Sequence, residues 1–312
     1  MIGIPSTVDH MGEINMAKAG FIGLGQMGKP MSRNLMKGGY DLKVYDLSQD
    51  AMQDIVKNGA EAAANAREAA VGADVVFTML PTGAIVEQSV FGPCGIAEGM
   101  SMDAVFVDMS TILPEETRSI GRRLAEQGIA MVDAPVGRTS AHAIGGTVTF
   151  MVGGDSADVA RITPYLECMG QMITHCGPLG AGAVVKLVNN YISAVTNVVT
   201  AEGLAYGLAA GVSEDTMVEV ISQTPAGLGH ITTTWPAKAL IDDPAPAFQL
   251  DLARKDIGLA LTAAAAAKAP MATGAVAREI YNIASAKGHG REDWSTGIFR
   301  TVKYLAKGKT DG

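Results

Sequence analysis

The stretch Ala19-Gly-Phe-Ile-Gly23-Leu-Gly25-Gln-Met-Gly28 decides the fold of this chain. A short apolar run leads into three glycines spaced as GxGxxG, and a helical pattern from Lys29 to Lys37 follows. In this context the first glycine permits a tight turn, the second lets a ligand approach the backbone, and the third lets helix and strand pack closely. The helix N-terminus offers free N–H groups to phosphates. We therefore expect a dinucleotide to bind here, contacting Gly23, Gly25, Gln26, Met27 and Gly28.

An acidic residue follows the next predicted strand, Asp41-Leu-Lys-Val-Tyr45. A carboxylate at this position accepts hydrogen bonds from ribose hydroxyls and repels a 2′-phosphate. Asp46 therefore predicts NAD(H) rather than NADP(H), although an ordinary turn residue after a strand is the alternative.

Strand and helix patterns alternate through the first half of the chain. Further strands are predicted at 74–79, 104–108, 129–132, 146–152 and 172–175, with helices at 114–127 and 156–169. Such alternation predicts an α/β domain of the Rossmann type, with a doubly wound and mostly parallel sheet. The carboxyl ends of its strands face the ligand crevice. Leu80, Pro81 and Thr111 directly follow strands and are candidate cofactor contacts, unless they are ordinary loop residues.

The strand pattern stops after Gly177-Pro178, and helical spacing then continues from Gly180 to about Ala210. We expect this long helix to join the sheet domain to an all-helical C-terminal domain. The predicted organisation is a disordered extension at 1–15, an NAD-binding domain at 16–178 and a helical substrate and oligomerisation domain at 179–312. The helical part has much apolar surface for its size, which predicts packing against a second copy of the chain.

Three polar residues interrupt the apolar pattern of the long helix. Lys186, Asn189 and Asn190 stand at positions i, i+3 and i+4, so their side chains share one helix face. A solvated stripe would explain a lone lysine, but the paired asparagines and the apolar flanks favour a lined cleft. Burial lowers the pKa of a lysine, which makes Lys186 a candidate general acid near neutral pH.

A second polar segment, Asp133-Ala-Pro-Val-Gly137-Arg138-Thr139-Ser140, also follows a predicted strand. Its glycine, hydroxyls and guanidinium can donate many hydrogen bonds. The planar guanidinium of Arg138 suits an oxyanion. A surface arginine without a ligand is the alternative.

Composition limits the possible partners. The chain has 312 residues, a net charge of −8, 48% hydrophobic residues and 18% charged residues, as expected of a globular enzyme. The negative charge disfavours nucleic acids and anionic membranes. The three cysteines show no metal or redox spacing, which suggests a reducing, cytoplasmic compartment. We expect no metal site, no transmembrane helix and no signal peptide.

Four stretches, taken in order, resemble the beta-hydroxyacid dehydrogenase family. They are Phe21–Gly28, Asp133–Val136, Lys186–Asn190 and Leu252–Asp256, and the similarity runs from Met16 to about Leu305. The resemblance implies hydride transfer to or from NAD(P) and a homodimer or homotetramer. It also implies that Lys186 is the catalytic lysine, that Asn190 holds the substrate and that Lys255 lies near the nicotinamide.

One departure from that family concerns the substrate. Most members have Ser-Gly-Gly after Asp-x-Pro-Val, whereas this chain has Gly137-Arg138-Thr139-Ser140. Together with residues 229–236 and 290–294, the segment resembles the branch that reduces a sulfonated aldehyde. A sulfonate has three equivalent oxygens and needs more donors than a carboxylate. The guanidinium, with donors from Thr139, Ser140, Asn189 and Ser193, could supply them.

Other readings of the same residues stay open. The arginine could hold a carboxylate on a longer chain such as succinic semialdehyde. The chain would then be a dehydrogenase for 3-hydroxyisobutyrate, 4-hydroxybutyrate or another hydroxy acid. A dinucleotide-sensing protein without activity is a third reading, against which Lys186 and Asn190 both argue.

Overall fold

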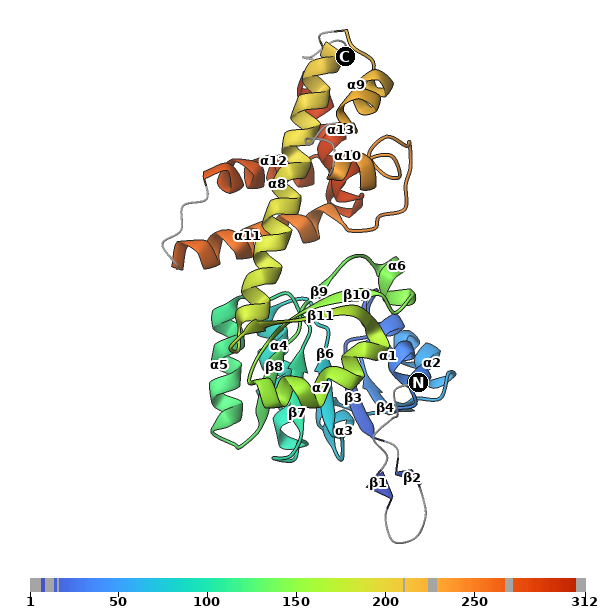
Figure 1. Ribbon diagram of the computed structural model, residues 1–312, viewed down its shortest axis with the longest axis vertical. Coiled ribbons are helices and arrows are strands. Elements are labelled where there is room, and N and C mark those ends of the chain that lie inside the picture. Colours follow the sequence, from blue (N-terminus) through green and yellow to red (C-terminus); the bar gives the residue numbers. More distant parts are fainter. Residues whose placement is uncertain are drawn as a thin grey trace. The chain divides into compact units, whose positions relative to one another are not determined.

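The computed structural model describes residues 7–8, 14–15, 17–209, 211–223, 229–266 and 272–306 (Figure 1). The chain divides into two compact units, Met1–Lys186 and Leu187–Gly312. This division runs through helix α8 (Ala181–Ala209), whereas the sequence pattern placed the boundary just ahead of that helix. Within the predicted extension at 1–15, β1 (Thr7–Val8) and β2 (Ile14–Asn15) pair antiparallel, and the remaining residues lie outside the described part.

The first unit is built on a nine-stranded sheet with the order β11-β10-β8-β7-β6-β3-β4-β5 and with β9 paired to β10. The strands are β3 (Lys18–Ile22), β4 (Asp41–Tyr45), β5 (Glu61–Ala62), β6 (Val75–Thr78), β7 (Val105–Asp108), β8 (Ala130–Asp133), β9 (Val136–Gly137), β10 (Val148–Gly153) and β11 (Gly170–Gly177). In this sheet the antiparallel pairings are those of β10 with β8 and with β9, whereas β10 pairs in parallel with β11. The predicted doubly wound, mostly parallel sheet is confirmed.

Strand β3 lies at the point where the strand order reverses. It pairs in parallel with β4 on one side and with β6 on the other, so Phe21 stands opposite both Val44 and Phe77. In open sheets of this kind the ligand crevice lies beyond the carboxyl ends of the strands at the reversal. The glycine turn that follows Ile22 therefore stands at the expected ligand edge.

Helices cover both faces of this sheet (Figure 1). They are α1 (Gly28–Lys37), α2 (Gln49–Val56), α3 (Ala66–Ala70), α4 (Gly83–Phe91), η1 (Ile96–Glu98), α5 (Pro114–Ala125), α6 (Ser140–Ile144) and α7 (Ser156–Met169). Neighbouring residues of β6 belong to different cores, because successive side chains of a strand point to opposite faces: Phe77 packs in one cluster and Val76 in the other. Burial on both faces explains the continuous apolar strand sequences.

In the described part of the second unit, the regular elements are all helices. It holds α8 from Leu187 onward, α9 (Glu214–Ile221), α10 (His230–Thr233), α11 (Leu250–Ala266), α12 (Ala272–Ala286), η3 (His289–Arg291) and α13 (Trp294–Ala306). Its core gathers around the buried Asn197, whose Oδ1 accepts from Trp235 Nε1 at 2.8 Å. The His230 ring meets the Trp294 ring edge-on at 5.0 Å. The two sequence stretches around these residues thus build the helical core.

Two details of this unit differ from the sequence expectations. The glycines and hydroxyl donors of 227–236 suggest a loop from sequence alone, but this stretch contains the short helix α10; residues 224–228 lie outside the described part. The apolar and alanine-rich sequence at 257–269 predicts a helix there, but α11 already begins at Leu250, because Leu250, Ala253 and Ile257 continue the buried stripe toward the N-terminus. Its last described residue is Ala266, so the predicted end at 269 lies outside the description.

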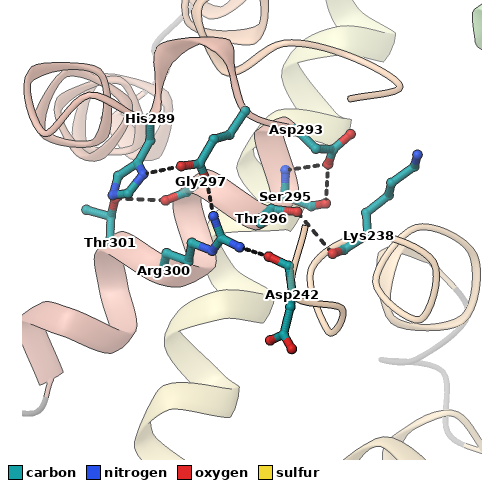
Figure 2. A network of polar contacts seen from close by, with 10 residues as sticks. Lys238, Asp242, His289, Asp293, Ser295, Thr296, Gly297, Arg300 and Thr301 are labelled. Atoms are coloured by element: carbon teal, nitrogen blue, oxygen red, sulfur yellow. Dashed lines mark hydrogen bonds and ion pairs between the residues drawn. The ribbon is translucent and has the colours of Figure 1, made fainter. Parts of the chain in front are cut away.

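Figure 2 shows how the start of α13 is held. Asp293 Oδ1 accepts from Ser295 Oγ at 2.5 Å, and its Oδ2 accepts from the Ala247 backbone at 3.0 Å. Arg300 bonds Glu292 at 2.9 Å and also donates to the Asp242 carbonyl. These contacts tie the loop after α10 to α13, so we regard the network as structural.

Candidate active site

The three glycines of the turn have different environments. Gly23 has φ +98°, and a Cβ there would collide with the Met79 carbonyl; a Cβ on Gly28 would collide with the Gly23 carbonyl. Around Gly25, by contrast, a Cβ would meet nothing within 4 Å. The chain's own packing therefore requires the first and third glycines but not the second. Open space at Gly25, beside the N–H groups that begin α1, fits a pyrophosphate.

Asp46 is fixed against this turn. Its Oδ2 accepts from the Leu24 backbone at 2.6 Å, and its Oδ1 accepts from the Ser48 backbone at 2.7 Å. A carboxylate has about four acceptor positions, so positions remain for ribose hydroxyls. The carboxylate thus lies beside the glycine turn.

The loops after β6 and β7 are tied together at the same edge of the sheet. Buried Asp108 accepts from Thr78 Oγ1 at 2.8 Å and from the Ser110 backbone at 3.1 Å. Ser110 Oγ in turn accepts from the Leu80 backbone at 2.9 Å. Burial raises the pKa of Asp108, and its hydrogen bonds oppose that effect. The structure therefore brings Leu80, Pro81 and Thr111 to the edge that carries Gly23.

Arg138 adopts a left-handed backbone conformation with φ +75°. This region costs a non-glycine residue about 1–2 kcal/mol, which explains why a glycine is the ordinary choice at such a turn. The exposed guanidinium donates from Nη1 to the Thr147 carbonyl at 3.3 Å. Thr139 occupies the N-cap position of α6 without a side-chain capping bond; its Oγ1 lies 3.0 Å from His142 Nδ1, and Ser140 is the first residue of α6.

The polar face of α8 is organised by a residue on another helix. Asn189 Nδ2 donates to Asn190 Oδ1 at 3.1 Å, and Asn190 Nδ2 donates to Asp256 Oδ2 on α11 at 2.5 Å. Lys255 Nζ lies 3.1 Å from Asp256 Oδ1. A lysine beside an aspartate in sequence is usually a surface ion pair, but here the carboxylate of Asp256 is buried.

This contact sets the orientation of the Asn190 amide. An ionised carboxylate only accepts hydrogen bonds, so Nδ2 must face Asp256, and Oδ1 faces the polar stripe of α8. Lys186, half-buried, stands one turn earlier on the same face. Asn190 therefore presents an acceptor to this stripe, suited to an ammonium or a hydroxyl.

Ser193 stands in the next turn of the same helix. Its backbone carbonyl lies 2.6 Å from His230 Nε2. Burial lowers the pKa of His230, so the ring is neutral at neutral pH and its Nε2 carries the proton that this bond needs. His230 thus supports the backbone of α8 at Ser193.

Asp133 is a further residue that sequence reasoning did not assign. Its Oδ1 accepts from the Gly180 backbone at 2.6 Å, and its Oδ2 accepts from the Ala183 backbone at 2.7 Å, both at the start of α8. The only sequence signal was an acidic residue at the end of a buried strand.

The predicted residues fall in both units. The glycine turn, Asp46, the 138–140 turn and Lys186 belong to the first, and Asn189, Asn190, Ser193 and Lys255 belong to the second.

Both units match known families. Residues 18–177 match the NAD binding domain of 6-phosphogluconate dehydrogenase, and residues 180–300 match the NAD-binding domain of NADP-dependent 3-hydroxyisobutyrate dehydrogenase. The chain is 46% identical to a 3-sulfolactaldehyde reductase of Escherichia coli (strain K12), covering 93% of this chain and 97% of that protein. It is 39% identical to an NAD-dependent L-serine dehydrogenase of Pseudomonas aeruginosa, covering 90% and 96%. The chain belongs to the beta-hydroxyacid dehydrogenase family.

A solved member of this family has the same fold. A 3-hydroxyisobutyrate dehydrogenase of Mycobacterium tuberculosis, determined with L-serine, aligns with a TM-score of 0.82 and 33% identity, covering 91% of this chain and 99% of that one. The predicted family, the NAD cofactor and the assignment as an oxidoreductase are thus confirmed. The described residues contain no helix able to cross a membrane and no group of three or more His, Cys, Asp or Glu side chains arranged for a metal ion.

Proposed function

We propose that this beta-hydroxyacid dehydrogenase reduces 3-sulfolactaldehyde to 2,3-dihydroxypropane-1-sulfonate with NADH. The similarity to the E. coli reductase supports this substrate, as does the chemistry of the turn at 137–140.

The observation that carries the proposal is the conformation of Arg138. The chain places a side chain at φ +75°, where glycine would avoid a cost of about 1–2 kcal/mol. Strained positions of this kind persist where function retains them. A guanidinium has five N–H donors, and the bond to Thr147 uses one of them, so others can bind an oxyanion. We assign Arg138, Thr139 and Ser140 to the sulfonate.

The cofactor contacts follow from the glycine turn and the strand ends. We assign the pyrophosphate to the backbone of Gly23, Gly25, Gln26, Met27 and Gly28, and the adenosine ribose to Asp46. Leu80, Pro81, Thr111 and Lys255 are the further contacts that we propose. When bound, NADH supplies the hydride for the carbonyl carbon.

Proton transfer is assigned to Lys186. Its ammonium stabilises the negative charge that develops on the carbonyl oxygen and then donates a proton to that oxygen. Asn190 Oδ1, fixed by Asp256, accepts a hydrogen bond from the ammonium or from a substrate hydroxyl. We assign further substrate contacts to Asn189, Asn190 and Ser193.

A carboxylate substrate is the second candidate. The guanidinium of Arg138 can equally pair with a carboxylate. Relatives named L-serine dehydrogenase and 3-hydroxyisobutyrate dehydrogenase, the latter from Pseudomonas aeruginosa at 36% identity, point the same way. Under this alternative the chain acts on 3-hydroxyisobutyrate, 4-hydroxybutyrate with succinic semialdehyde, or a related hydroxy acid.

A panel of aldehydes tests the choice. NADH oxidation is followed with 3-sulfolactaldehyde, with succinic semialdehyde and with a neutral aldehyde of similar size, and kcat/KM is compared. The proposal expects the sulfonated aldehyde to be preferred. A higher kcat/KM for the carboxylate would replace it with the hydroxy-acid reading.

We also propose that the chain works as a homodimer or homotetramer. One face of α8 exposes apolar side chains at helical spacing: Val188 at 52%, Ile192 at 57% and Val199 at 56%. Such a stripe favours packing against another protein surface. Light scattering during gel filtration measures the mass, and a monomer across the micromolar range would contradict the proposal. The cytoplasmic location stays a prediction.

A further inference from the structure

We propose that Asp133 is a positioning residue for Lys186, setting where the helix that carries the lysine begins. The inference deepens the proposed function, because it rests on the assigned role of Lys186. Asp133 is also the last residue of β8, the strand that leads toward Arg138, so it joins the start of the lysine's helix to the sheet from which the arginine turn follows.

The carboxylate uses both oxygens on the start of α8. Gly180 N–H donates to Oδ1 at 2.6 Å and Ala183 N–H donates to Oδ2 at 2.7 Å. The first N–H groups of a helix have no partner inside the helix, so these bonds satisfy groups that would otherwise be left unpaired. Asp133 is 1% exposed, so water cannot replace it.

Two glycines, which lack a Cβ, allow the helix start to lie directly against this carboxylate. A Cβ on Gly182 would collide with the Met151 carbonyl, and a Cβ on Gly153 would collide with Asp133 Oδ1. Gly153 on β10 stands directly opposite Asp133 on β8. No side chain separates the first turn of α8 from the sheet at these positions. The helix start therefore cannot move without losing the carboxylate contacts.

The same residue begins the path to Arg138. Asp133 is the last residue of β8, and the Pro135 carbonyl then accepts from the Met151 backbone at 3.1 Å before β9 leads to Arg138. In the other direction, Lys186 follows Ala183 within the next turn of α8. All of these residues lie in the first unit. A displaced carboxylate would shift Lys186 relative to the turn at Arg138.

The test separates positioning from ordinary stability. Asp133→Asn keeps the size of the side chain but turns one acceptor into a donor that faces a backbone N–H. We expect kcat, calculated from the concentration of protein that binds NADH, to fall about 10- to 100-fold, because small misplacements of catalytic groups have effects of that size. The Kd for NADH, measured by fluorescence titration, should stay within about twofold, since the glycine turn is untouched.

A matched control is available in the same domain. Asp155 caps α7 through the Ala157 N–H at 2.8 Å, but that helix carries none of the assigned catalytic residues. Asp155→Asn should leave kcat unchanged. An equal loss of kcat in the two variants would assign the effect to general destabilisation and overturn the proposal.

A double variant tests whether Asp133 acts through Lys186. In a Lys186→Ala background, Asp133→Asn should lower kcat little further, because the group that it positions is absent. Losses that multiply would overturn the proposal. Lys186→Ala alone reports on the proposed chemistry: if it leaves kcat near normal, the role of the lysine has failed, whatever Asp133 does.

Asp133→Ser is the second variant, because it keeps one acceptor and adds no amide donor. It should show the same fall in kcat with NADH binding retained. If neither variant folds, Asp133 serves the stability of the whole unit, and the positioning role is wrong.

Discussion

The carboxylate of Asp256 accepts a 2.5 Å hydrogen bond from the side-chain amide of Asn190, joining α11 to α8. Because the NH₂ group of Asn190 donates to this carboxylate, the amide oxygen of Asn190 is oriented toward the polar stripe of α8. The orientation of one carboxamide thus depends on a buried residue from a distant part of the chain.

Asp256→Asn should weaken both stability and activity. A hydrogen bond to a charged group contributes about 1.5–3 kcal/mol, so the free energy of unfolding should fall by about that amount. The new side chain no longer dictates which end of Asn190 faces it, and kcat/KM should fall about tenfold, equivalent to about 1.4 kcal/mol. Urea unfolding and NADH oxidation measure the two effects. Asp251→Asn, on the same helix but more exposed, is the control and should change kcat/KM far less.

Lys186→Ala should lower kcat by about 10²-fold or more, the effect expected when a positioned general acid is lost. NADH should still bind, because the glycine turn does not involve this lysine. Stopped-flow and steady-state rates with the preferred aldehyde measure the loss. A near-normal kcat would mean that another group donates the proton, and Lys255 would be examined next.

Asp46 should make NADH a far better cofactor than NADPH, because a 2′-phosphate would meet the fixed carboxylate. Asp46→Asn combined with Leu47→Arg should relax or reverse the preference. Leu47 is 88% exposed, so the arginine has room, and asparagine keeps an acceptor for the Leu24 N–H. The ratio of kcat/KM for the two cofactors is the measurement. Equal use of both by the unmutated protein would sink the claim.

The sequence was sufficient for features that depend on local chemistry. The spacing of Gly23, Gly25 and Gly28 between an apolar run and a helical pattern marks a strand–turn–helix unit, so β3, α1 and β4 could be predicted, and with them the place of Asp46. The shared face of Lys186, Asn189 and Asn190 follows from helical spacing alone.

The partners of buried carboxylates could not be predicted in this way. Asp256 is 66 residues from Asn190 in sequence, and Asp133 is 50 residues from Ala183. The neighbouring residues in sequence do not distinguish an acidic residue that caps a distant helix from one that forms a surface ion pair. The left-handed conformation of Arg138 was also hidden, because arginine does not signal it as glycine does.

Asp133 should make stability depend on pH in a defined direction. Burial raises the pKa of its carboxyl from 3.8 to about 6, and the Gly180 and Ala183 N–H groups oppose that shift. The folded state thus favours the neutral acid, so the free energy of unfolding falls as the pH rises from about 4 to about 6 and is level above. Over this range the free energy of unfolding of the wild type should fall by up to about 3 kcal/mol relative to that of Asp133→Asn. Urea unfolding from pH 4.5 to 7 measures this, and a constant difference between the two proteins would contradict it.

Arg138→Gly should separate stability from activity. Glycine relieves a left-handed conformation but adds freedom to the unfolded chain, and these effects nearly cancel, so Tm should be unchanged or slightly raised. Losing a charge-assisted hydrogen bond of about 1.5–3 kcal/mol should lower kcat/KM for the sulfonated aldehyde about 10- to 150-fold. A neutral aldehyde of similar size should be affected far less, because it gives the guanidinium no anionic partner. Arg138→Lys keeps the charge but lacks the planar guanidinium, so its kcat/KM for the sulfonated aldehyde should lie between those of the wild type and Arg138→Gly.

If charged and neutral aldehydes lose rate equally, Arg138 is structural and the sulfonate assignment loses its physical support. The reading as a beta-hydroxyacid dehydrogenase would survive, because Lys186 and the glycine turn do not depend on this arginine.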